Sequence, residues 1–96
     1  MRSSPEALTG HARRRLQQRG IPAQALEHLM DYGRAAHDHH GARIVYFDHK
    51  ARQRMERTLG PSGMKGFERQ LGIYAVVAAD GTVITVGHRH RRIRHH

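Results

Sequence analysis

The sequence predicts a single α+β domain, and two observations carry this prediction. Two short segments in the first third have apolar residues at helical spacing, and each is followed by a glycine. The remainder consists of β-rich runs interrupted by one more helical segment. We therefore expect two N-terminal helices packed on a small, mainly antiparallel β-sheet, with a further helix inserted between hairpins.

The two N-terminal helices are short and closely connected. The first runs from Thr9 or Gly10 to Arg19. The second occupies residues 23–32 and ends at Gly33. Because only a few residues separate them, we expect the two helices to form a helical hairpin.

The middle of the chain predicts two strands and the inserted helix. Residues 34–40 and 42–48 flank Gly41 as strands around a turn, and the second is apolar on both faces, which suits an interior strand. Residues 49–59 return to helical spacing. The stretch 60–66, which contains Gly and Pro, predicts a mobile loop.

The last third predicts a β-hairpin. Asp80-Gly81, a preferred turn dipeptide, joins the β-rich runs 72–79 and 82–88. No internal repeat or linker divides the chain. These features complete the expected sheet.

Length and composition set the remaining limits on the domain. With 96 residues, the chain forms one domain over 1–96, with a loose lead-in at 1–8 and a basic extension at 88–96. The absence of cysteine fits a reducing compartment. No segment is apolar for long enough to span a membrane. We therefore expect a cytoplasmic protein with no membrane partner.

The charge of the chain predicts a polyanionic partner. Lysine and arginine number 17 against 8 acidic residues, and all but two of these cations are arginine. The planar guanidinium binds phosphate in bidentate fashion, so nucleic acid is the partner we expect, although a coding bias towards arginine would also raise the count. No zinc-finger or homeodomain pattern supports sequence-specific reading of DNA.

Three motifs in a fixed order resemble a known family. His-Ala-x-x-Arg-x-x-x-Arg-Gly-Ile at 11–21, the Gly33 that ends the second helix, and Asp-Gly-x-Val-Ile-Thr-Val at 80–86 resemble the family known as domain of unknown function 4258. That family is similar to the RelE-like and barnase-like small bacterial ribonucleases. The resemblance implies a metal-independent endoribonuclease, the toxin of a toxin–antitoxin pair, whose partners are RNA, free or on the ribosome, and an acidic antitoxin protein.

The first helix contains the first candidate site. His11, Arg15 and Arg19 follow one another at i, i+4 and i+8, so they lie along one side of the helix. Metal-free cleavage of RNA needs a base, an acid and cations near the phosphate, and histidine suits either proton role. His11 is therefore the first catalytic candidate, with the two arginines as phosphate ligands. The alternative for His11 is a hydrogen bond to a local carbonyl.

The end of the chain contains the second candidate. His88 closes the last predicted strand and is followed by a cluster of arginines, Arg89, Arg91 and Arg92. We expect the first helix to pack across this strand, which would bring His88 towards the first helix as the second catalytic group. Tyr46 and Tyr74 are auxiliary donors. The alternative is that His88 belongs to a solvated basic tail.

Other histidines and cations receive separate predictions. His37, His39, His88 and His90 would share strand faces and so suggest zinc, but without cysteine this spacing is not that of an ordinary zinc site, and we predict no metal and no cofactor. The cations of segment 49–59 include Lys50 and Arg54, which we predict to contact nucleic acid, a solvated surface being the alternative.

Two functions other than cleavage stay open. The same basic surface would serve a non-catalytic RNA- or DNA-binding module. It would also serve a small adaptor or inhibitor that binds an acidic protein. A catalytic histidine must lie within reach of a second proton-transfer group and an arginine, whereas a binding module needs only an exposed basic surface.

Overall fold

The computed structural model describes residues 8–37 and 41–89, and within them it has three α-helices and one four-stranded antiparallel sheet. The predicted α+β class is therefore confirmed. Most of the predicted lead-in and of the basic extension falls outside the described residues. The helices are α1 (Gly10–Gln18), α2 (Ala23–Tyr32) and α3 (His49–Met64), with a short 3-10 helix η1 (Glu68–Gln70).

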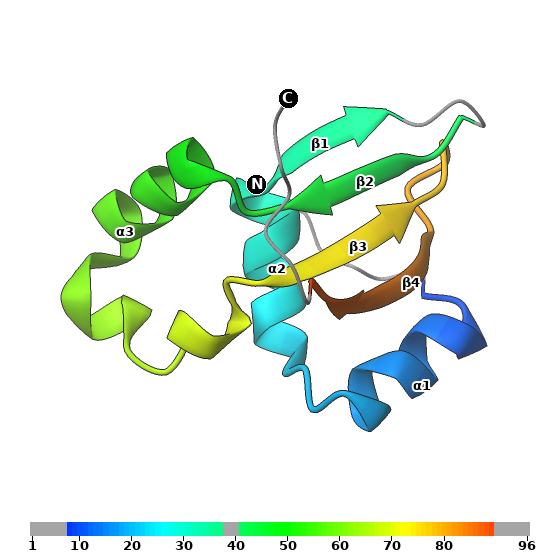
Figure 1. The fold of residues 1–96 in the computed structure, drawn as a ribbon, viewed down its shortest axis with the longest axis horizontal. Helices are drawn as coiled ribbons and strands as arrows, with labels where there is room; N and C mark the ends of the chain where they lie inside the picture. The colour runs from blue at the N-terminus through cyan, green and yellow to red at the C-terminus, as the bar shows by residue number, and fades with distance from the viewer. Residues whose placement is uncertain (1–7, 38–40, 90–96) are drawn as a thin grey trace.

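The strands follow chain order across the sheet (Figure 1). They are β1 (Arg34–His37), β2 (Arg43–Tyr46), β3 (Ile73–Val77) and β4 (Val83–His88). The pairs β1–β2 and β3–β4 are the two predicted hairpins, and α3 is inserted between them. Strand β2 is interior, as its apolar sequence predicts.

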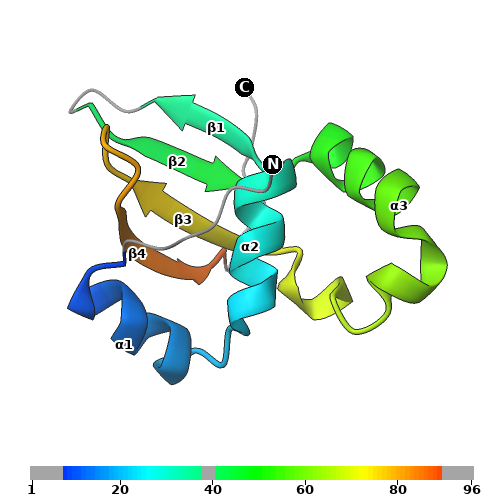
Figure 2. The same cartoon turned by 180° about the vertical axis from the view of Figure 1, so that it is seen from behind.

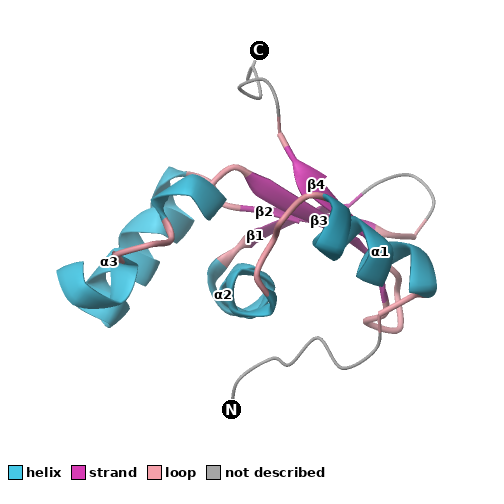
Figure 3. Ribbon diagram, turned by 90° about the horizontal axis from the view of Figure 1, so that it is seen from below, coloured by secondary structure: helices cyan, strands magenta, loops and turns pink. Residues whose placement is uncertain are grey.

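The two faces of the sheet differ in what covers them. On one face the register partners Val45, Ala75 and Val86 are buried in a common core with Leu26 and Leu29 of α2. Figures 2 and 3 show α2 lying across this face, whereas no described helix covers the other. We call the other side the open face. Strand alternation gives it two register rows, Arg34–Tyr46–Tyr74–Gly87 and Ala36–Ile44–Val76–Thr85.

Helix α1 lies beside β4, at the edge of the sheet (Figure 3). Its N-cap Thr9 accepts a hydrogen bond from the backbone N–H of Ala12 and donates its hydroxyl to the carbonyl of Ile84, at 2.9 Å. The backbone N–H of Thr9 also donates to the carbonyl of Val83. Because the cap residue is bonded to β4, the start of α1 is fixed against that strand.

The expected helical hairpin is not the arrangement found. Helix α1 packs on β4, whereas α2 packs on β2, β3 and α3, because the two buried stripes meet different parts of the sheet. Helix α2 ends where predicted, but Gly33 has an extended backbone. Glycine is needed there for space, since a Cβ would lie 2.8 Å from a methyl group of Val45.

Helix α3 extends beyond its predicted end. Gly60, with φ of 70°, kinks the chain, and helical structure resumes to Met64. The predicted 60–66 loop is therefore wrong for most of that stretch. The resumed turn starts with Pro61, a residue suited to a first helical position, and buries Met64 in the core. Among the described residues, no helix has the length and apolarity needed to span a membrane.

Candidate functional site

His11 stands where α1 meets the open face. Its Nε2 atom lies 3.1 Å from the Thr85 hydroxyl on β4, and Arg15 Nε–H donates to the same nitrogen over 3.4 Å. A nitrogen that accepts a hydrogen bond carries no proton, so this arrangement corresponds to the neutral ring with its proton on Nδ1. The imidazole is exposed. The structure thus joins the predicted His11 and Arg15 and adds Thr85, from 74 positions along the chain.

Tyr74 lies across the same part of β4. A Cβ built on Gly87 would lie 3.0 Å from Tyr74 Cε1 and 3.1 Å from its hydroxyl oxygen, so the phenol passes directly over this glycine. Gly87 and Thr85 are two residues apart on the open face, roughly 7 Å along the strand. The phenol of Tyr74 and the imidazole of His11 therefore contact neighbouring positions of one strand face.

A cation and an aromatic ring stack beside this pair. The guanidinium carbon of Arg89 lies 4.6 Å from the ring centroid of Tyr46, which is the register partner of Tyr74. The backbone N–H of Arg89 donates to the Gly72 carbonyl over 2.7 Å, which continues the β3–β4 pairing by one residue. Partial burial lowers the pKa of Arg89, but an arginine stays charged at neutral pH. The open face thus carries a fixed cation–π pair.

His88 occupies the opposite end of the contact between α1 and β4. Its Nε2–H donates to the backbone carbonyl of Arg19, 3.2 Å away, just beyond the end of α1. Arg19 follows His11 by eight positions, which is roughly 12 Å along a helix. Residues 85 and 88 also point to opposite sides of the strand. The structure therefore brings both histidines to α1 and β4 but does not bring them to one phosphate.

The remaining predicted cations have separate positions. Arg54 donates from Nη2 to the Tyr32 carbonyl over 2.9 Å, so it satisfies an unpaired carbonyl at the end of α2. Lys50 lines a hollow at the start of α3, away from His11. Arg91 and Arg92 lie outside the described residues. Arg19 is exposed, and its backbone rather than its guanidinium makes the contact with His88.

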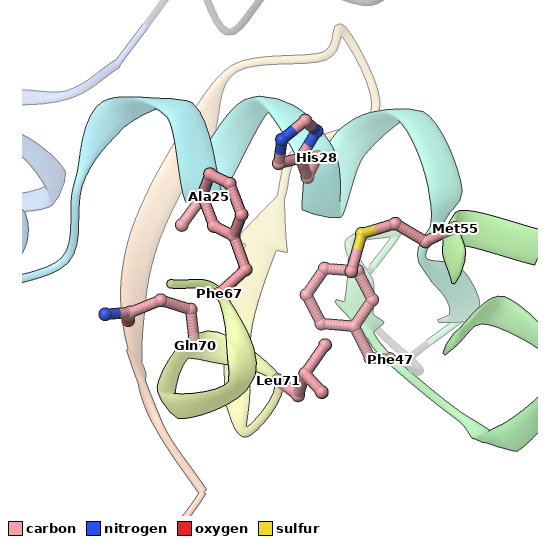
Figure 4. Close-up of a pocket in the computed structure, with 7 residues that line it drawn as sticks. All are labelled: Ala25, His28, Phe47, Met55, Phe67, Gln70 and Leu71. Carbon is pink, nitrogen blue, oxygen red and sulfur yellow. The ribbon is translucent and has the colours of Figure 1, made fainter. Parts of the chain in front are cut away.

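The interior around His28 and the grouping of the ligating side chains bear on a bound ligand or metal. Figure 4 shows the interior space around His28, where the lining side chains leave no room for a water molecule. The Gln70 Oε1 atom in this lining is buried without a hydrogen-bond partner. No set of three or more His, Cys, Asp or Glu in the described ranges is grouped to hold a metal, and His39, His40 and His90 are not described.

A groove on the other side of α1 is distinct from the His11 site. It has a volume of about 390 Å³ and lies between α1 and α2. Arg13 and Gln17 line it, and helical geometry places them roughly opposite His11 and Arg15 on α1. The lining is otherwise apolar: Leu8, Leu16, Ile21, Ala23 and Leu26. Arg13 therefore contributes to a different surface from Arg15.

Sequence reasoning missed Thr85, Gly87 and Arg34. The alternation of the last strand would have indicated that Thr85 and Gly87 share a face. The pairing of this face with Tyr74 and Tyr46 depends on the register, which the alternation alone does not give. Arg34 falls within a predicted strand, and no pattern in the sequence marks it as a site residue.

The comparisons with known proteins give no relative. No family model, no curated protein and no solved structure matches this chain. The resemblance to domain of unknown function 4258 therefore stays a prediction.

Proposed function

We propose that this protein is a metal-independent endoribonuclease that binds RNA on its open face and uses His11 as the proton-transfer group. One observation carries the proposal: the His11 imidazole contacts both Thr85 and Arg15 at the margin of a face that bears two tyrosines. RNA cleavage requires a proton acceptor and a cation that stabilises the phosphate charge. Binding of single-stranded RNA uses aromatic rings on which the bases stack.

In the proposed mechanism, His11 is the proton acceptor. His11 Nε2 removes the proton from a ribose 2′-hydroxyl, and the resulting oxygen attacks the adjacent phosphorus. The bond to the 5′-oxygen then breaks, which leaves a 2′,3′-cyclic phosphate on one product and a 5′-hydroxyl on the other. Arg15 stabilises the negative charge that grows on the phosphoryl oxygens. In the free protein the Thr85 hydroxyl bonds to Nε2 and positions the imidazole over β4, and the ribose hydroxyl replaces it at that nitrogen when RNA binds.

Tyr74 supplies the second proton role. A phenol keeps its proton at neutral pH and can donate it to the leaving 5′-oxygen. Its position over Gly87 lies next to the strand position that His11 contacts. Base stacking on the half-buried Tyr74 ring would contribute about 1–3 kcal/mol of binding free energy.

The test is cleavage of a labelled single-stranded RNA at low salt by the parent protein and by His11→Ala. We expect the parent to give cyclic-phosphate ends and His11→Ala to lose cleavage while it still binds. His37→Ala is the matched control, because His37 is also an exposed histidine but lies on β1, outside the site. Equal cleavage by His11→Ala and the parent would remove His11 from the mechanism.

A non-catalytic RNA-binding module is the second candidate. One observation favours it: His11 is exposed, whereas catalytic groups usually lie in a cleft. This function predicts that the parent binds RNA without cutting it and that His11→Ala changes binding only slightly.

A further inference from the structure

A second hollow lies on the open face where β1, β2 and α3 meet. It has a volume of about 430 Å³ and is lined by Arg34, Tyr46, Asp48, His49 and Lys50. Arg34 and Tyr46 belong to the register row that continues to Tyr74 and Gly87. The hollow and the His11 site are therefore two parts of one face.

The charges of this hollow favour an anion. Its two permanent cations, Arg34 and Lys50, face one carboxylate. That carboxylate, on Asp48, already accepts from the Ala51 N–H at 2.8 Å and from Arg34 Nη1 at 3.2 Å. Asp48 thereby also caps α3, so the cationic side chains rather than the helix end would bind an anion. Lys50 itself is exposed.

Arg89 adds a cation beside the lining of the hollow, through its stack on Tyr46. Its guanidinium lies over the ring of Tyr46, and that ring also lines the hollow. An anion that enters would meet one cation from β1 and one from α3. Cations from two separate segments around one concave space create the positive potential that attracts a phosphate.

The distance between the hollow and His11 shows whether both could bind the same phosphate. Tyr46 and Gly87 are two strands apart, roughly 10 Å, and Thr85 is two residues further along β4, roughly 7 Å. The hollow is therefore roughly 12 Å from the position that His11 contacts, too far for both to hold one phosphate.

We infer that this hollow is a second phosphate subsite, which holds the backbone of a single-stranded RNA several atoms of chain away from the phosphate at His11. The inference rests on the proposed function. The strand would run across the open face between the two sites, with Tyr74 beneath its bases. The subsite thus sets the direction of the strand and requires a substrate longer than the cleaved step itself.

The experiment measures RNA binding against salt concentration for two lysine variants. Lys50→Gln removes the cation of the hollow, and Lys65→Gln is the matched control, because it removes the same charge from the exposed residue at the other end of α3. The probe is a hexanucleotide RNA with 2′-O-methyl riboses, which cannot be cleaved by the proposed mechanism. Because log K falls as log salt rises, the loss of one phosphate contact makes this negative slope shallower by about 0.7 for a single strand.

We expect Lys50→Gln to show this shallower slope and Lys65→Gln to keep the parent slope. Equal slopes for the two variants would overturn the subsite while leaving the proposed function intact. If the parent binds no RNA, the proposed function fails, and titration with inorganic phosphate decides the subsite. Shifts of the backbone amide signals of His49 and Lys50 in the parent, absent in Lys50→Gln, support an anion site, whereas no shifts overturn it.

Discussion

His11 and His88 lie at opposite ends of the contact between α1 and β4. The groups to which they hydrogen-bond distinguish a candidate reactive histidine from a structural one. His11 and His88 each place Nε2 about as close to a partner, at 3.1 and 3.2 Å. His11 meets a hydroxyl and a guanidinium, both of which can be exchanged for parts of a ligand. His88 meets a backbone carbonyl of Arg19, and a carbonyl only accepts, so the proton of His88 is committed to holding the end of α1 against β4.

The difference follows from which side of β4 each contact involves. Thr85, which contacts His11, points to the open face, whereas His88 alternates to the other side. The same residue type therefore faces a potential ligand at one end and the fold at the other.

The largest expected effect separates the two histidines directly. His11→Ala should lower the cleavage rate by about 10²–10⁴, because a general base typically contributes this much. His88→Ala should leave cleavage largely unchanged and lower the free energy of unfolding by about 1 kcal/mol, because one hydrogen bond is lost. Single-turnover cleavage and urea unfolding measure the two quantities. A loss of cleavage in His88→Ala without loss of stability would break the comparison.

The next effect concerns Tyr74 and the glycine beneath it. A Cβ at position 87 would lie 3.0 Å from Tyr74 Cε1, which is closer than ordinary van der Waals contact. Gly87→Val should therefore displace the phenol and lower the free energy of unfolding by about 1–3 kcal/mol. Tyr74→Phe keeps the ring and removes only the hydroxyl, so it should slow cleavage and leave RNA binding unchanged. Comparing kcat with Kd for Tyr74→Phe checks this. A change confined to Kd would assign Tyr74 to binding alone.

A smaller effect is expected at the partner of His11. Thr85→Val retains the shape of the side chain but removes its hydroxyl, which leaves the imidazole less well oriented. The loss of one neutral hydrogen bond, about 1 kcal/mol, predicts a roughly fivefold slower cleavage. Thr82→Val in the β3–β4 turn changes the same residue type outside the site and serves as the control.

The smallest effect lies outside the α1–β4 contact and depends on pH. The Ala51 N–H and Arg34 lower the pKa of Asp48 from 3.8, so its charged form stabilises the folded state. This stabilisation is present above the unfolded pKa and is lost as the pH falls through the folded pKa. Asp48→Ala should therefore cost about 1 kcal/mol at neutral pH, and less below about pH 4. Unfolding curves at pH 7 and pH 3 measure the difference, and an equal cost at both would refute it.

The sequence predicted the elements better than their packing. Thr9, Gly33 and Asp80-Gly81 mark element ends by local chemistry, so the helices and the last hairpin could be found from spacing alone. The stretch after Gly60 was misread as a loop, because its helical turn depends on the burial of Met64, and no local pattern contains that information.

The candidate site divides in the same way. The chain alone determined that His11 and Arg15 share one side of a helix, since a spacing of four residues fixes this wherever the helix lies. Only the tertiary structure decided that Thr85 would meet His11 and that Tyr74 would lie over Gly87, because strand register and the docking of α1 on β4 are long-range contacts. It also decided that His88 turns to the carbonyl of Arg19 and away from the open face.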